Sequence, residues 1–259
     1  MFPIRDSIPT RRTPVVTYGL IAVNLLVFLY QLSLGPQQTE VLFYLYGIVP
    51  ARLTDAAWAA QVGLPFSLVP FLTTQFLHGD LFHLVGNLWM LWIFGDNVED
   101  RLGRPRFLAF YLGCGFAAGG LHFLTNWSSQ IPAVGASGAI AGVLGAYFLL
   151  HPTSRVLTLV PIFFYPLFVE LPAFVFLGLW FLLQLFSGTA SLLSSGGAGI
   201  AWWAHIGGFV AGMLWLRSYL RRHPPAPQVT YPYGPQGPPV IDLEPPPHEV
   251  PPRDPRRRW

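Results

Sequence analysis

Five polar side chains lie in otherwise apolar segments of this chain and are the residues best suited to chemistry: His83, Asn87, His122, Ser137 and His205. Polar groups inside a bilayer are costly, so those that persist there are functional candidates. A serine hydroxyl within hydrogen-bond reach of an imidazole is the minimal activated nucleophile. Ser137 and His205 are therefore the candidates for a nucleophile and its base.

Small residues surround both members of this pair. The serine lies in Gly135-Ala-Ser-Gly138, and Gly142 follows on the same segment. Gly208 and Gly212 follow His205 at i+3 and i+7, on the face of the histidine itself. Because small residues let membrane helices approach closely, the two segments are predicted to touch and to bring the imidazole to the hydroxyl.

Each candidate also has a structural interpretation. Ser137 between glycines can be a packing residue, and His205 can make an interhelical hydrogen bond without catalysis. His83 and Asn87, four residues apart on one helix face, can tie helices together, and His122 can be an interfacial residue. In the orientation that the arginines predict (below), His83, Ser137 and His205 nevertheless fall within about two turns of the outer ends of their segments. At 1.5 Å per residue this is about 5–10 Å below the outer surface. This shared depth favours one site.

Composition indicates the elements that must position these residues. Of 259 residues, 53% are hydrophobic and 10% are charged, with a mean hydropathy of +0.47, whereas a soluble domain has about 25% charged residues. A membrane helix needs about 20 mostly apolar residues. Six segments approach this length and are interpreted as membrane helices: 18–34, 81–98, 107–124, 134–150, 172–186 and 200–220. The first is interpreted as a membrane helix rather than a secretory signal that is cleaved off.

The arginines predict the orientation of these segments. All 15 basic residues are Arg, and with a cytoplasmic N-terminus fourteen of them fall on the inner side, leaving only Arg52 outside. This satisfies the positive-inside rule, so both termini are predicted to be cytoplasmic. Since the arginines flank apolar segments, nucleic-acid binding is disfavoured. The outer loop 35–80 is long and apolar, and we expect it to lie partly in the membrane interface.

Two further segments are distinguished by proline. Pro161 and Pro166 interrupt the apolar run 156–169, which predicts an inner-face hairpin or an interfacial stretch. From residue 223 onward the chain holds 13 of its 26 prolines, typical of a disordered tail. A solvated tail is favoured over one that binds a proline-reading partner.

The predicted organisation is a cytoplasmic segment 1–16, a membrane domain 17–221 and a Pro-rich cytoplasmic tail 222–259.

The ordered set of motifs resembles the rhomboid family of intramembrane serine proteases over about residues 15–220. The matching pieces are His83-Leu-Val-Gly-Asn87, Gly135-Ala-Ser-Gly138, Ala204-His-Ile-Gly-Gly208 and the segment 95–103. The Trp-Arg pair that some members carry in the first outer loop is missing.

This resemblance implies an all-α fold, a six-transmembrane-helix bundle of rhomboid type, with the serine of a short fourth helix under a water-filled outer cavity. It implies Ser137 as nucleophile and His205 as general base, with His83, Asn87 and the Ser137 amide stabilising the oxyanion. Donors aimed at developing negative charge in a water-poor site independently favour the last role.

The charged residues favour a dyad over a triad. Between residues 101 and 241 the only carboxylate is Glu170, which the topology places a membrane's width from Ser137. Three carboxylates at the inner end of the second helix are expected to pair with nearby arginines: Asp96, Glu99 and Asp100, with Arg101 or Arg104. No metal and no cofactor are expected.

The sequence thus predicts a multi-pass protein of a bacterial-type cell membrane that hydrolyses membrane-anchored protein substrates near the outer face. Two alternatives come from other functional classes. A catalytically silent rhomboid-like protein that binds membrane proteins would be expected to lack Ser137 or His205. A transporter would place its polar groups near the membrane midplane, whereas here they gather near one surface.

Overall fold

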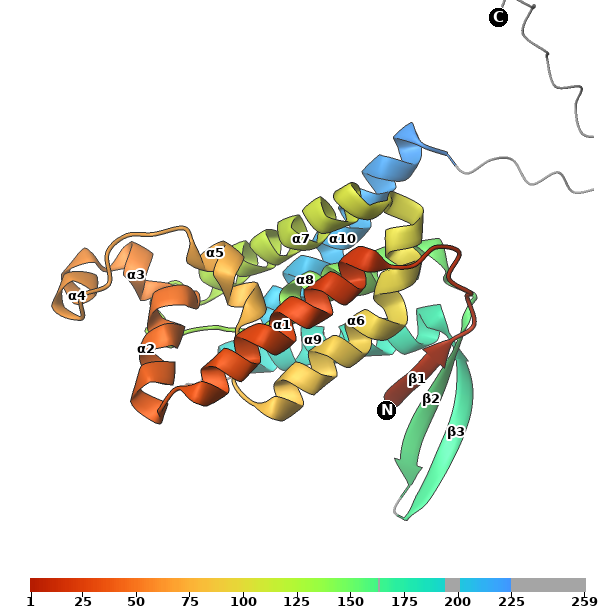
Figure 1. Cartoon of the computed structure of the whole chain (residues 1–259), viewed down its shortest axis with the longest axis horizontal. Helices are drawn as coiled ribbons and strands as arrows, with labels where there is room; N and C mark the ends of the chain where they lie inside the picture. The colour runs from red at the N-terminus through yellow and green to blue at the C-terminus, as the bar shows by residue number, and fades with distance from the viewer. Residues whose placement is uncertain (163, 194–200, 225–259) are drawn as a thin grey trace, which may run out of the picture. The chain divides into compact units, whose positions relative to one another are not determined.

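The computed structural model describes residues 1–162, 164–193 and 201–224 of the chain. Residues Met1–His223 form one compact unit, which is mostly helical (Figure 1). The predicted Pro-rich tail lies, beyond residue 224, outside the described residues.

Each of the six predicted apolar segments coincides largely with one helix. Their bounds are α1 Val15–Ser33, α6 Leu81–Leu102, α7 Arg104–Thr125, α8 Ser137–Leu150, α9 Ala173–Leu193 and α10 Trp202–Arg222. Within the described part of the chain, α1, α7 and α9 are long and apolar enough to cross a membrane, and α8 is a shorter apolar helix of 14 residues. The chain therefore has the helices of an integral membrane protein.

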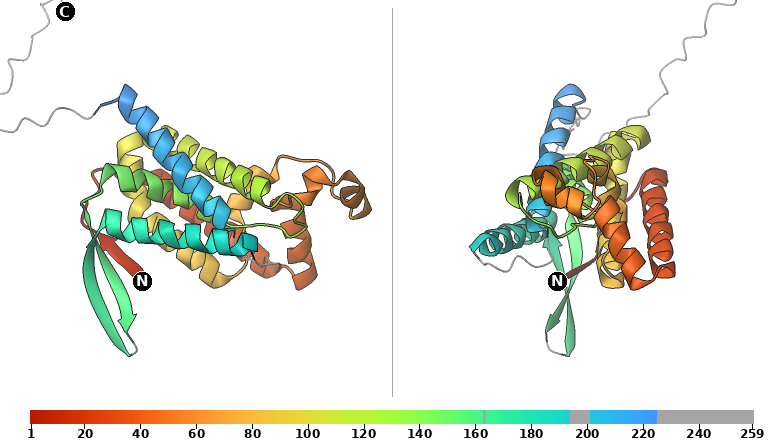
Figure 2. Two further views of the ribbon diagram at one scale, coloured as in Figure 1. Left: turned by 180° about the vertical axis from the view of Figure 1, so that it is seen from behind. Right: turned by 90° about the vertical axis from the view of Figure 1, so that its left-hand side faces the viewer.

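Helix α8 lies at the centre of this bundle, and α6, α7, α9 and α10 pack against it (Figure 2). Every residue from Gly138 to Tyr147 is buried. The closest approach is to α10: a Cβ atom added at Gly208 would lie 1.9 Å from the Gly138 carbonyl oxygen, and one at Gly212 would lie 2.0 Å from that of Gly142. The predicted glycine contact between these two helices is confirmed, because only hydrogen side chains fit there.

The segment 35–80, predicted as an outer loop, contains several short helices. It contains α2 Pro36–Tyr46, α3 Ala51–Thr54, α4 Ala56–Gln61, α5 Pro70–Thr73 and the 3-10 helix η1 Thr74–Phe76. The buried Arg52 side chain donates hydrogen bonds to the backbone carbonyls of Pro65 (2.7 Å) and Leu45 (2.9 Å). The guanidinium thus ties distant parts of the loop together.

A three-stranded antiparallel sheet corrects the all-α expectation. Its strands are β1 Phe2–Asp6, β2 Arg155–Ile162 and β3 Tyr165–Pro172, in the order β1-β2-β3. The β2–β3 pair shows that this run forms a hairpin, one of the two predicted alternatives, and its register places Pro161 opposite Pro166. Proline lacks the N–H that a helix interior needs, which favours strands here. The pairing of Phe2 with Leu159 was not predicted, because it joins the two ends of a long chain segment.

The carboxylates near the end of α6 accept hydrogen bonds from residues 10–17, so their predicted pairing with Arg101 or Arg104 is wrong. Glu99 accepts hydrogen bonds from the Val16 N–H (3.0 Å) and from both the N–H and the hydroxyl of Thr17 (2.8 Å each). Asp100 accepts from the N–H groups of Arg11 and Arg12, and Asp96 from the Thr10 hydroxyl. For Glu99 the physical reason is that the first N–H groups of α1 have no partner within the helix. Asp96 and Asp100 instead bind the segment that precedes α1.

Candidate active site

Ser137 and His205 meet at the contact between α8 and α10. The Ser137 Oγ lies 2.7 Å from His205 Nε2. Ser137 is the first residue of α8, and His205 lies in the first turn of α10. The structure thus brings together the two residues that the sequence predicted as nucleophile and base.

The other ring nitrogen of His205 binds a residue of a third helix. Its Nδ1 lies 2.7 Å from the Oε1 atom of Gln184, a buried residue of α9. An amide oxygen only accepts, so Nδ1 carries the proton in this arrangement and Nε2 is left to accept from the serine hydroxyl. Gln184 therefore selects the tautomer that a general base requires.

Sequence reasoning did not include Gln184 among the five polar residues best suited to chemistry. A signal was present, because a buried amide in a membrane helix needs a hydrogen-bond partner. Which residue that partner is depends on how α9 is rotated against α10. This rotation is decided by packing and cannot be read from one segment.

His83 packs on the backbone just before the serine. Gly135 has φ +139°, and a Cβ atom added there would lie 2.7 Å from His83 Cε1 and 2.8 Å from its Nε2. Glycine is thus required both by the backbone conformation and by the imidazole. Asp80 fixes the start of α6 by accepting a hydrogen bond from the His83 N–H at 2.8 Å.

Asn87 lies one turn further along α6. Its buried Nδ2 atom has no hydrogen-bond partner among the described residues. An unpaired buried donor costs free energy of about 1–3 kcal/mol, so an acceptor is expected to occupy this position at some stage. Asn87, His83 and Ser137 line one cavity.

The cavity has a volume of about 660 Å³. Its walls come from α6, α7, α8, α9 and α10 and from the segment 129–134, and they include His122, Asn126, Trp180, Gln184, Trp202 and His205. His122 is buried, with its Nδ1 3.3 Å from the Asn126 Nδ2. All five polar candidates named from the sequence therefore line the same cavity, although shared depth had predicted this only for His83, Ser137 and His205.

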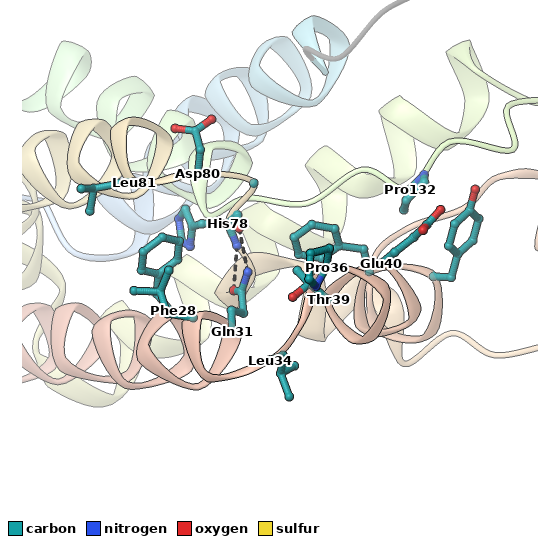
Figure 3. A pocket seen from close by; sticks show the side chains of 14 residues that line it. Phe28, Gln31, Leu34, Pro36, Thr39, Glu40, His78, Asp80, Leu81 and Pro132 are labelled. Atoms are coloured by element: carbon teal, nitrogen blue, oxygen red, sulfur yellow. Dashed lines mark hydrogen bonds between the residues drawn. The ribbon is translucent and has the colours of Figure 1, made fainter.

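A second cavity of about 540 Å³ lies between α1, α2 and the start of α6 (Figure 3). There the Gln31 side chain bonds both backbone groups of His78, donating to the carbonyl oxygen at 2.7 Å and accepting from the N–H at 3.1 Å. Burial lowers the pKa of the His78 imidazole to about 4, so the ring is neutral at pH 7. It packs edge-to-face on His83 with ring centroids 5.3 Å apart, which gives His83 a rigid neighbour.

The fold and the site together define a helical integral membrane protein with a serine–histidine pair in a polar cavity. The rhomboid domain model matches residues 65–222, which is more than half of the chain, and the chain belongs to the rhomboid family. The matched range contains every site residue described above.

Individual relatives agree with this assignment. The chain is 29% identical over 152 residues to the human mitochondrial presenilin-associated rhomboid-like protein, covering 58% of this chain and 35% of that protein. It is 32% identical over 143 residues to the rhomboid protease GluP of Bacillus subtilis, covering 55% and 26%. It is 33% identical over 101 residues to the mitochondrial rhomboid protein 1 of Saccharomyces cerevisiae, covering 36% and 28%. The chain thus spans about a third of the length of these relatives or less.

Proposed function

We propose that this chain is an intramembrane serine endopeptidase that cleaves membrane-anchored protein substrates with Ser137 as nucleophile and His205 as general base. The observation that carries the proposal is the 2.7 Å contact between the Ser137 Oγ and His205 Nε2 inside a polar cavity. The family includes a relative named as a rhomboid protease. Neither a metal nor a cofactor is required by the chemistry that follows.

In the proposed reaction the Ser137 oxygen attacks the substrate carbonyl carbon while its proton passes to His205 Nε2. The tetrahedral intermediate collapses as the C–N bond breaks, and His205 returns the proton to the departing amine. A water molecule then attacks the acyl-enzyme with His205 again as base, releasing the carboxyl product and restoring Ser137. Every proton that moves passes through Nε2.

The negative charge of the intermediate needs donors at the serine. His83, Asn87 and the Ser137 N–H are proposed for this role. The unpaired Asn87 Nδ2 supports it, and so does the position of Ser137 at the first residue of α8, where the N–H has no partner within the helix. Such preorganised donors are typically worth about 3–4 kcal/mol each in the transition state.

The membrane arrangement of the proposal has six spanning helices with both termini on the cytoplasmic side, in a bacterial-type cell membrane. The distribution of arginine supports this orientation. At 14 residues α8 is about 21 Å long, shorter than the hydrocarbon core of about 30 Å. Its first residue, Ser137, would thus lie below the outer surface, and the cavity would supply water to it.

A substrate helix must unwind locally to reach Ser137, because its backbone groups are hydrogen-bonded within the segment. Helix-weakening residues near the outer end of a substrate helix are therefore proposed to favour cleavage, with Gly or Pro lowering the cost of unwinding by about 1–3 kcal/mol. The close approach of α8 and α10 also suggests a small residue just before the cut.

Gln184 is proposed as a positioning residue that extends the dyad. In Gln184→Leu, the Nδ1–H loses its acceptor, and we expect the turnover number to fall about tenfold to a hundredfold, less than full loss of the general base would cost. Gln184→Glu keeps an acceptor and should recover most of this loss. In Gln184→Glu the acid limb of the pH–rate profile should move to higher pH, because a nearby carboxylate favours the protonated imidazole of His205.

Gln31→Leu is the matched control for this experiment, since it also removes a buried amide. The Gln31 side chain makes two hydrogen bonds, both outside the Ser137 cavity. We expect it to lower the melting temperature without moving the pH–rate profile. Equal turnover and identical pH profiles in wild type, Gln184→Leu and Gln184→Glu would show that Gln184 has only a packing role.

A fluorophosphonate probe tests the proposed function directly. It should label the purified protein covalently, and mass spectrometry should place the label on the peptide containing Ser137, because His205 activates only that hydroxyl. Competition by a single-span substrate should slow the labelling. A folded protein that stays unlabelled would instead favour the catalytically silent, binding role.

A further inference from the structure

The β2–β3 hairpin exposes bulky apolar side chains that the proposed reaction does not use. Phe164 is 97% exposed, Tyr165 80% and Phe168 57%. Ile162 and Leu167 are exposed as well. A water-facing strand pair normally presents polar residues on at least one face, whereas no charged residue occurs from Val156 to Val169.

Charge on this hairpin is confined to its base. Arg155 and Glu170 form an exposed ion pair with a 2.9 Å contact between Nη1 and Oε2. Other exposed arginines lie near this end of the bundle, on or after β1: Arg5, Arg11 and Arg12. The apolar tip and the charged base are thus separated along the strands, and an exposed apolar patch of this kind marks an interaction site.

The hairpin leaves the bundle sideways. In Figure 2 it projects from one end of α9 across the helix direction, and the end-on view shows it beyond the other helices. In the membrane arrangement proposed above the helices run along the membrane normal, so this direction lies in the membrane plane. The hairpin follows the C-terminal end of α8, whereas Ser137 begins that helix, so it belongs to the leaflet opposite the site.

We propose that the hairpin tip inserts into the headgroup–acyl boundary of that leaflet and binds lipid there. Beyond the charged base, α9 also has exposed apolar residues such as Phe174 and Leu179, which are suited to face lipid in an integral membrane protein. At eight residues each strand reaches about 26 Å from its base. The tip can therefore sit well outside the helical bundle.

The backbone limits how deep the tip can lie. β3 is an edge strand, and its unpaired N–H and C=O groups would be costly in the hydrocarbon core. At the boundary, water and headgroups can satisfy them while the side chains reach about 5–10 Å into the acyl region. Pro166 on this edge removes one donor and disfavours pairing with a strand of a second copy.

Spin labels at single cysteines test this proposal, which does not require proteolysis. In a Cys114→Ala background of the full chain, a nitroxide at Phe164→Cys would be compared with one at Glu170→Cys in vesicles of phosphatidylcholine and phosphatidylglycerol. We expect the label at 164 to collide more with oxygen, which partitions into lipid, and the label at 170 to collide more with a water-soluble nickel chelate. Tyr165→Cys is a second tip reporter in case the first variant fails to fold.

A tip label that collides mainly with nickel would place the hairpin in water and overturn the proposal. A tip label shielded from both reagents would indicate protein contact, from a second copy or another partner, and would also overturn it. Helix content by circular dichroism, equal to that of the Cys114→Ala parent, confirms that each reporter is folded.

Discussion

Ser137→Ala and His205→Ala should each lower the rate of cleavage of a single-span substrate by about 10⁴-fold to 10⁶-fold, because each removes one half of the proton-transfer pair. The double variant should be hardly slower than either single variant, since the two side chains act as a unit. The measurement is substrate cleavage by purified protein in proteoliposomes.

Stability separates this effect from unfolding. Each substitution removes a contact worth about 1 kcal/mol, so the variants should melt close to the wild type. Ser33→Ala and His223→Ala, at exposed positions outside the cavity, are the matched controls and should cleave normally. Near wild-type turnover in Ser137→Ala would remove this serine from the mechanism.

Gly208→Ala is expected to have the second largest effect, through packing alone. The new methyl group would lie 1.9 Å from the Gly138 carbonyl oxygen, so α10 must move away from α8. This overpacking should cost about 1–3 kcal/mol of stability. A displacement of about 1 Å also separates the Ser137 and His205 side chains, and turnover should fall at least about 100-fold.

Gly178→Ala is the matched control, because nothing lies within 4 Å of a Cβ atom added at this position of α9. Alanine also has the higher helix propensity, by about 1 kcal/mol, so this variant should be as stable as the wild type or more so. Thermal melts and substrate cleavage measure both effects. If Gly208→Ala behaves like Gly178→Ala, the helices are not as close as the structure places them.

Several features of this protein can be read from local sequence. Apolar length marks each long helix, because a membrane helix must satisfy its backbone internally and bury an apolar surface in lipid. Spacing predicts the glycine contact between the segments of Ser137 and His205, because residues three, four and seven apart share one helix face. The prolines of the run 156–169 predict a hairpin or an interfacial stretch, because proline interrupts a helix locally.

Other features depend on contacts between residues far apart in the chain. The Gln184–His205 hydrogen bond requires a particular rotation of α9 against α10. The cap that Glu99 provides for α1 and the pairing of Phe2 with Leu159 join segments 82 or more residues apart. The residue pattern within one segment contains no information about such partners, because the same pattern is compatible with many different neighbouring segments.

Sequence by itself therefore determined that this is a rhomboid-type helical membrane protein and which serine and histidine are its candidates, because helix length, residue spacing and short motifs are local properties. Only the tertiary structure decided that the fold includes a sheet, that Gln184 stands behind His205 and that an apolar hairpin leaves the bundle. These features follow from how complete helices and strands pack and rotate against one another. The packing depends on the shape and polarity of surfaces that form only in the folded chain.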